Sequence, residues 1–107
     1  MTESKIVSEG DKVTLSLFGE VDHHSARAIR EACDKELLLR TPRRLVLDFS
    51  GVSFMDSSGI GLIIGRADLA ESIGCCVIVS GLSDMLLRLV RMSGVEKIKN
   101  ITLRQGL

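Results

Sequence analysis

RLVLDFSGVSFMDSSGIGLIIGRADLAESIGCCVIVS, residues 44–80, is the stretch of sequence that sets the fold of this chain. An apolar run over residues 44–49 indicates a buried strand, and a second run over residues 75–80 indicates another. Between them, residues 58–72 carry apolar side chains at helical spacing, and Gly74 is a common kind of helix stop. Two buried strands joined by a helix form a parallel βαβ unit, so this stretch predicts an α/β fold.

The preceding half of the chain predicts a hairpin and a helix. Residues 12–19 alternate polar and apolar side chains, as a half-buried strand does, and residues 5–9 are expected to pair with them. Residues 25–40 contain no Gly or Pro and predict a helix that is capped by Asp22 or Ser25. The helix face expected to point inward consists of Ala28, Ile29, Ala32, Cys33, Leu37 and Leu38.

The last part of the chain predicts one more helix and one more strand. Ser83 is a favourable cap for a helix that runs through Met92, and residues 98–103 alternate as a strand does. The side chains of this helix expected to point inward are Met85, Leu86, Leu89 and Val90. We therefore expect one domain over residues 1–107, with a mixed, mostly parallel β-sheet packed against α-helices.

The composition limits the classes of function. A chain of 107 residues with 45% hydrophobic content suffices for one domain with a core. Lys and Arg total 14, as do Asp and Glu, and the sequence has neither Trp nor Tyr, so it lacks the basic, stacking surface of a nucleic-acid binder. The longest strongly apolar stretch, residues 60–64, is too short to span a bilayer. We expect a cytoplasmic protein with no nucleic-acid or membrane partner.

The cysteines give no indication of a metal site or a disulfide framework. Cys33, Cys75 and Cys76 are odd in number, and none of them forms a C-x-x-C unit. We expect them to be reduced and mostly buried, with no metal bound.

The sequence FMDSSGIG, residues 54–61, is where a strand passes through a short loop into a helix. Asp56, Ser57 and Ser58 are residue types that cap helices, whereas Gly59 and Gly61 each cost about 1 kcal/mol of helix propensity relative to Ala. Glycines at this point permit close approach of another chain. A serine at a helix N-terminus is also a favourable phosphorylation site, although Asp56 would repel the added charge.

Other interpretations of these residues remain open at this point. The three polar residues could cap the helix and do nothing else. The serines could act with His23, His24 and an Asp as a hydrolase, but a G-x-S-x-G elbow is missing. The glycines match no nucleotide-binding motif, and the two adjacent histidines fit a surface loop better than a metal site.

Three segments of the chain resemble a known family. They are FMDSSGIG at residues 54–61, GEVDHHSA at residues 19–26 and LVRMSGVEKI at residues 89–98. Together, and in this order, they resemble the anti-sigma factor antagonists, which are single STAS domains of bacteria. The D-H-H element is similar to the sporulation branch of this family.

The resemblance implies a partner switch. In this family the unphosphorylated antagonist binds an anti-sigma factor that is also a serine kinase, and the sigma factor is released. The kinase then phosphorylates the antagonist with ATP, and a PP2C-type phosphatase reverses the step. The resemblance makes Ser57 the acceptor, Ser58 the helix cap and Asp56 the acidic neighbour. It implies a protein without catalysis or a cofactor of its own, which is monomeric when free.

The resemblance also implies a kinase-binding surface beside the acceptor. It would consist of Glu20, Asp22, His23, Met55 and Arg66. The net charge of −3 over residues 1–36, against +3 over the rest, fits a basic partner at this surface, although solvated helix faces would look similar.

The chain departs from the family pattern in two places. Family members usually continue into a C-terminal helix, which we expect to be absent or truncated here, and residues 48–50 replace a strand end that more often contains Asn. A different class of function also remains open, namely a STAS module that binds a ligand or serves as a scaffold without being phosphorylated.

Overall fold

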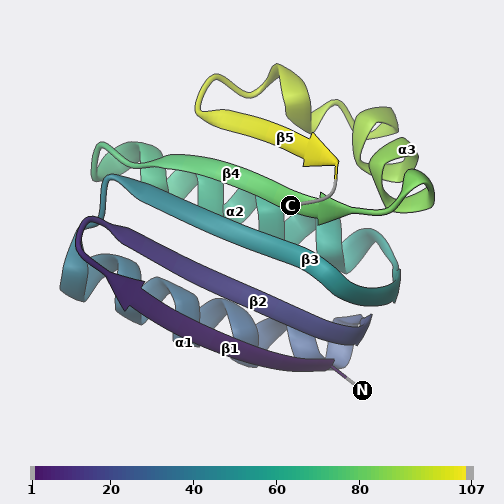
Figure 1. Ribbon diagram of the computed structural model, residues 1–107, viewed down its shortest axis with the longest axis horizontal. Coiled ribbons are helices and arrows are strands. Elements are labelled where there is room, and N and C mark those ends of the chain that lie inside the picture. Colours follow the sequence, from purple (N-terminus) through teal and green to yellow (C-terminus); the bar gives the residue numbers. More distant parts are fainter. Residues whose placement is uncertain (1, 106–107) are drawn as a thin grey trace.

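The fold is a five-stranded sheet with helices packed against it, as a computed structural model describes it for residues 2–105 (Figure 1). In chain order the elements are β1 (Thr2–Glu9), β2 (Lys12–Val21), α1 (His23–Arg40), β3 (Arg44–Met55), α2 (Ser57–Ser72), β4 (Cys76–Leu82), α3 (Asp84–Met92), the 3₁₀ helix η1 (Val95–Lys97) and β5 (Ile101–Gln105). Residues 106 and 107, where the family's terminal helix would begin, lie outside the described residues.

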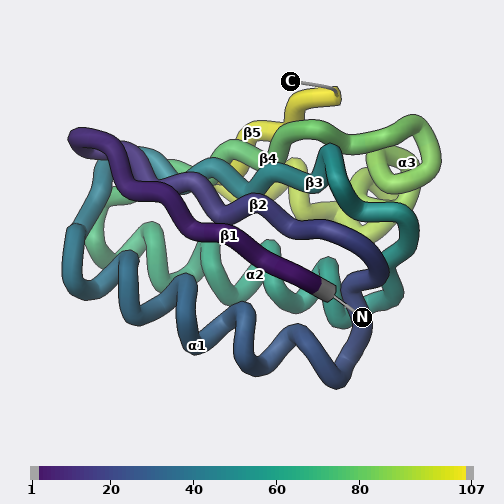
Figure 2. Tube along the Cα trace, turned by 60° about the horizontal axis from the view of Figure 1, so that its bottom comes forward, coloured from purple at the N-terminus to yellow at the C-terminus, as the bar shows by residue number. Residues whose placement is uncertain are grey.

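The strands are arranged in the order β1-β2-β3-β4-β5. β1 runs antiparallel to β2, and the other three neighbouring pairs are parallel. Figure 2 shows α1 and α2 side by side against one face of the sheet. The prediction of a mixed, mostly parallel sheet packed against helices is therefore confirmed. Because β2 and β3 are parallel and lead into α1 and α2, both helices begin at the same edge of the sheet.

The core lies between the sheet and these two helices. Alternate side chains of the central strands are buried, as the period of two predicts for a half-buried face. These side chains pack against a narrow stripe of apolar residues on each of the helices α1 and α2. The buried side chains of the two central strands and the two helices include Val13, Leu15, Leu17, Leu45, Leu47, Phe49, Ile29, Cys33, Leu37, Ile63 and Ala67.

The buried faces of α1 and α3 differ from those that the sequence pattern predicts. On α1 the expected inward positions Ala28, Ala32 and Leu38 are exposed, because only the stripe at i, i+4 and i+8 reaches the sheet. On α3 the prediction is wrong for Met85 and Leu89, which face outward, while Leu86, Leu87 and Val90 are buried.

Several strands are longer than predicted. β1 begins at residue 2 and β2 continues past Gly19, with two irregularities in its pairing with β3. β3 continues to Met55, so the loop expected before α2 is absent. Gly51 permits this extension, because a side chain there would collide with the ring of Phe18 on the neighbouring strand. β5 starts at Ile101, later than predicted, because residues 98–100 form a turn after η1 in which the N–H of Ile101 donates to the carbonyl of Ile98 at 3.1 Å.

Two further expectations concern membranes and cysteines. Among residues 2–105, no helix is long and apolar enough to cross a bilayer. Cys33 and Cys75 are buried free thiols, as expected, and Cys76 is exposed.

Candidate functional site

Ser57 is the first residue of α2 and follows β3 with only Asp56 between them. Asp56 adopts an extended conformation, and its Oδ1 accepts a hydrogen bond of 2.7 Å from the backbone N–H of Ser58. This is the geometry of a helix N-cap. The expectation that Ser58 caps the helix is therefore wrong: the cap is Asp56, two residues earlier, because α2 already begins at Ser57.

The two serines differ in their exposure. Ser57 is exposed, whereas Ser58 is half-buried on the side of α2 that faces α1. The Ser57 hydroxyl makes no hydrogen bond to any of residues 2–105. At the first position of a helix, an added phosphate is close to free N–H groups and to the positive end of the helix dipole. Ser57 is therefore placed so that its hydroxyl can be modified while the helix remains intact.

Gly59 is a glycine for a packing reason. It is buried, and a Cβ at this position would lie 2.6 Å from Sδ and 3.2 Å from both Cβ and Cγ of Met55. Met55 is the last residue of β3 and Gly59 lies in the first turn of α2, so Met55 packs against the start of that helix. Met55 is only 3% exposed, and the expectation that it lies on a partner-binding surface is wrong.

Gly61 has a different environment. It is exposed, and a Cβ there would meet nothing within 4 Å. Its backbone is helical, so neither packing nor an unusual φ angle requires a glycine. Gly61 lies one turn beyond Ser57, and its bare backbone lines a groove shared with residues of α1.

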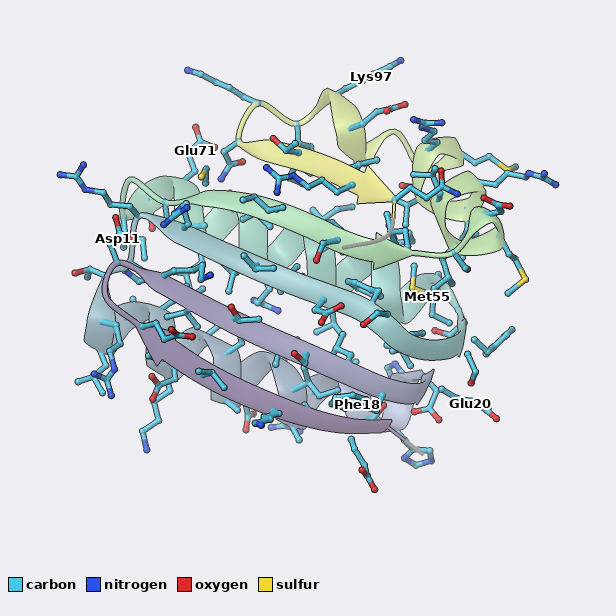
Figure 3. The ribbon with its side chains drawn as sticks, viewed as in Figure 1. Asp11, Phe18, Glu20, Met55, Glu71 and Lys97 are labelled. Atoms are coloured by element: carbon cyan, nitrogen blue, oxygen red, sulfur yellow. The ribbon has the colours of Figure 1, made fainter. Side chains whose placement is uncertain are left out.

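The end of β2 lies beside the candidate acceptor, as predicted. Glu20 pairs with Phe54 in the register of the two strands, and the backbone N–H of Asp56 donates to the carbonyl of Val21 at 3.2 Å. Figure 3 shows Glu20 and Met55 at the same edge of the sheet. Glu20 is exposed and accessible to a partner at this edge.

Asp22 and His23 form the start of α1. Asp22 is the N-cap and forms a capping box with Ser25, in which Oδ1 accepts from the Ser25 N–H at 3.0 Å. This backbone hydrogen bond, followed by that from the Ser25 hydroxyl, lowers the pKa of Asp22. His23 and His24 occupy the first turn of the helix, so the prediction of a surface loop for them is wrong, although both are exposed.

Arg66 is almost entirely buried and contributes little to the exposed surface. Only 4% of the residue is exposed, and its guanidinium pairs with Asp34 of α1. Nε lies 2.6 Å from Oδ1 without the angle of a hydrogen bond, and Nη2 donates to Oδ2 at 3.1 Å. The expectation of Arg66 as a kinase contact is corrected, because the residue joins the two helices instead.

The sequence interpretation missed Asp34 and the side chains near it on α1. The signal was present as spacing: His23, Arg27, Arg30 and Asp34 follow one another at intervals of four, three and four residues, which places them on one face of a helix. This face lies toward α2, where Arg66 meets Asp34.

The described residues give little support for a metal site or for a reactive thiol. Within residues 2–105, no group of three His, Cys, Asp or Glu side chains is arranged to hold a metal ion. Burial raises the pKa of the Cys33 thiol to about 12 and that of the Cys75 thiol to about 11. Both thiols are therefore protonated near neutral pH and are poor nucleophiles.

The comparisons with known proteins agree on the family. The STAS domain family matches residues 4–105 of the chain. The anti-sigma F factor antagonist of Paenibacillus polymyxa is 38% identical over 85 residues, which cover 79% of this chain and 73% of that protein.

Solved structures of one antagonist share the fold. The unphosphorylated form of the anti-sigma factor antagonist SpoIIAA matches with a TM-score of 0.82 at 26% identity, covering 94% of this chain and 87% of that chain. The phosphorylated form of the Bacillus protein SpoIIAA matches with a TM-score of 0.75 at 26% identity, covering 94% and 90%. In both sequence and fold, the chain belongs to the STAS domain family.

Proposed function

We propose that this chain is an anti-sigma factor antagonist and that Ser57 is its phosphoryl acceptor. The unphosphorylated form would bind an anti-sigma factor that is also a serine kinase, and the sigma factor would be released. The observation that carries the proposal is the placement of the Ser57 hydroxyl, which is exposed and unbonded within residues 2–105, at the edge that also carries Glu20. The relatives are named as anti-sigma factor antagonists, which supports the same conclusion.

The switch follows from charge at a docking surface. A phosphoserine carries about −1.5 to −2 charges at neutral pH. It would be added directly beside Asp56 and close to the end of β2 that carries Glu20. A kinase that packs against this edge removes water from it, so the extra charge is both repelled and poorly solvated there. Binding is lost, while the positive end of the α2 dipole favours the added charge, so the phosphate does not oppose the folded helix.

In this proposal, the partner kinase carries out the phosphoryl transfer. The kinase would supply ATP and the groups that activate the hydroxyl, and this chain would supply an accessible serine. Among the described residues, no hydrogen bond joins Ser57 or Ser58 to His23 or His24, so the geometry offers no observation in favour of the hydrolase interpretation. A PP2C-type phosphatase would restore the binding form. A protein with this cycle would act in the cytoplasm, where sigma factors act, and the likeness to SpoIIAA supports a role in sporulation.

A binding measurement with a charge variant tests the proposal. The anti-sigma factor kinase from the same genome is titrated with wild-type protein and with Ser57→Asp. The variant should bind at least about 30-fold more weakly, since an uncompensated charge in a desolvated interface costs 2 kcal/mol or more. Ser4→Asp is the matched control, because Ser4 is exposed on the edge strand β1, and it should bind like the wild type. Equal affinity of Ser57→Asp and wild type would contradict the proposal.

A further inference from the structure

β1 forms one edge of the sheet, with β2 as its neighbour on one side (Figure 1). Within residues 2–105, no strand pairs with its other side, so that side presents backbone N–H and C=O groups to which another strand can bind. Proteins often interrupt such an edge with a bulge. β1 instead pairs with β2 along its whole length in one unbroken register, so its outer edge is regular enough to accept a strand from another chain.

The exposed side chains of β1 form a short row of mixed character. Ile6 lies opposite Leu15 and packs against the core. Because side chains alternate along a strand, Lys5, Val7 and Glu9 lie on the other face of the sheet, which α1 and α2 leave uncovered. All three are exposed, and neither Lys5 nor Glu9 makes an ion pair within residues 2–105. The edge therefore presents a cation, an apolar side chain and an anion at intervals of two residues.

The charges of β1 select among the ways in which two copies of this strand can pair. In a symmetric antiparallel pair that extends the sheet, residues opposite one another share a face, so the two-fold axis passes through one residue. An axis at residue 5 or 6 brings like charges together. An axis at Ser4 pairs Glu3 with Lys5 twice, and an axis at Val7 pairs Lys5 with Glu9 twice. Only the axis at Val7 also joins the exposed apolar side chains, and cross-strand pairs of both kinds stabilise a sheet.

The position of α1 relative to β1 also favours the axis at Val7. A groove of about 420 Å³ lies between β1 and α1, and Ile6, Ser8 and Ala32 are among the residues that line it. The Ser8 hydroxyl donates to Oε2 of Glu36 at 3.2 Å. Val7 therefore lies level with residues 32–36 of α1, so a two-fold axis at Val7 passes near the middle of the helix.

The side of α1 toward this groove carries exposed apolar side chains. Ala28, Ala32 and Leu39 are spaced by four and seven residues, which places them on one face of the helix, and Leu39 is 68% exposed. α1 contacts both β1 and β2, and strands lie about 4.8 Å apart, so the two copies of α1 come within roughly 10 Å of each other, where helices pack. The two-fold axis reverses one helix relative to the other, so Ala28 of one copy lies near Leu39 of the second copy.

We infer that β1 is a docking edge for a second copy of this chain, and that the two copies of β1 pair antiparallel about Val7. The sheet continues from one copy into the other, and α1 packs against α1 behind it. This pairing occupies β1 of both copies, so it closes at a dimer. The free protein is then in equilibrium between monomer and dimer, in contrast to the monomer that the family resemblance implies. Ser57 stays accessible, because it follows β3 and β2 separates β3 from β1.

Sedimentation equilibrium of the protein alone, from about 10 μM to about 1 mM, tests the inference without any kinase. The average mass should rise with concentration from 11.6 kDa toward twice that value. Lys5→Glu places two carboxylates opposite each other on either side of Val7, and it should weaken dimerisation at least about tenfold. Adding Glu9→Lys should restore dimerisation, because opposite charges again face each other. Lys97→Glu is the matched control, since Lys97 is exposed on η1, and it should dimerise like the wild type.

The restored double variant also shows that the single change does not act by unfolding the chain. A wild-type protein that stays at 11.6 kDa up to about 1 mM overturns the inference. A dimer that Lys5→Glu and Lys97→Glu weaken equally, or that Lys5→Glu leaves intact, uses another surface and overturns it as well. A dimer that the double variant does not restore contradicts the axis at Val7, because Glu9 has no charged partner in the pairing about Ser4.

Discussion

The side chain of Met55 fills the space directly beside Gly59, where a Cβ would approach its sulfur to 2.6 Å. The last residue of β3 is thereby locked against the first turn of α2. This contact fixes the angle at which the strand enters the helix, and so it fixes the position of Ser57 between them.

Gly59→Ala should destabilise the protein by roughly 1 kcal/mol. Alanine gains about 1 kcal/mol of helix propensity, but overpacking against Met55 costs about 1 to 3 kcal/mol. Gly61→Ala is the matched control and should stabilise by about 0.5 to 1 kcal/mol, because its Cβ meets nothing within 4 Å. Urea unfolding of the two variants measures the difference. Equal stabilisation by both would show that Met55 does not constrain Gly59.

Asp34→Ala should be more damaging than Arg66→Met. The first change leaves a guanidinium that is buried without its partner, at a cost of about 2 to 3 kcal/mol, reduced because Asp34 itself is 29% exposed. The second leaves a carboxylate that can reach water. Glu31→Ala, which breaks an exposed pair, should cost less than about 0.5 kcal/mol. Unfolding free energies of the three variants decide the order, and a larger loss for Arg66→Met would refute it.

Asp56 both caps α2 with a hydrogen bond and carries a negative charge. Two substitutions separate the effects of the hydrogen bond and of the charge on stability. Asp56→Ala should cost about 1 kcal/mol of stability, because the hydrogen bond to the Ser58 N–H is lost. Asp56→Asn keeps a capping oxygen. It should cost only a few tenths of 1 kcal/mol of stability, since Asn and Asp cap helices about equally well. Chemical unfolding provides the values. If both variants lost the same stability, Asp56 would stabilise α2 by charge and not by capping.

Thiol labelling should distinguish the three cysteines. At pH 8, a thiol with a pKa of about 12 is ionised in roughly one molecule in ten thousand, so Cys33 should not react while folded. Cys75, with a pKa of about 11, should also be protected, and the exposed Cys76 should be labelled. Because burial raises both pKa values, labelling should increase with pH and reach three sites only on unfolding. Intact-mass measurement after iodoacetamide treatment counts the sites, and three rapid additions to the folded protein would contradict the burial.

The sheet and the acceptor motif were predictable because they depend on local patterns. Apolar alternation marked the strands, and the run of capping residues marked the start of α2. The pattern did not determine which apolar residues reach the core. Leu38 and Leu37 are adjacent and equally apolar, but only Leu37 faces the sheet.

The residues that the sequence misplaced depend on contacts between elements. Arg66 is buried because Asp34 of α1 lies opposite it, and periodicity within α2 carries no information about that neighbour. Met55 is buried because β3 continues farther than its apolar run suggests and then packs under Gly59. Distances between helices arise from packing and cannot be read from either helix alone.

The most direct test of the proposed switch is to locate the phosphate. The protein is incubated with the anti-sigma factor kinase and ATP, and peptides are mapped by mass spectrometry. We expect one phosphate on Ser57, lost in Ser57→Ala and retained in Ser58→Ala, because only the Ser57 side chain is exposed at the start of α2. A phosphate on Ser58, a phosphate that persists in Ser57→Ala, or no phosphate at all would contradict it.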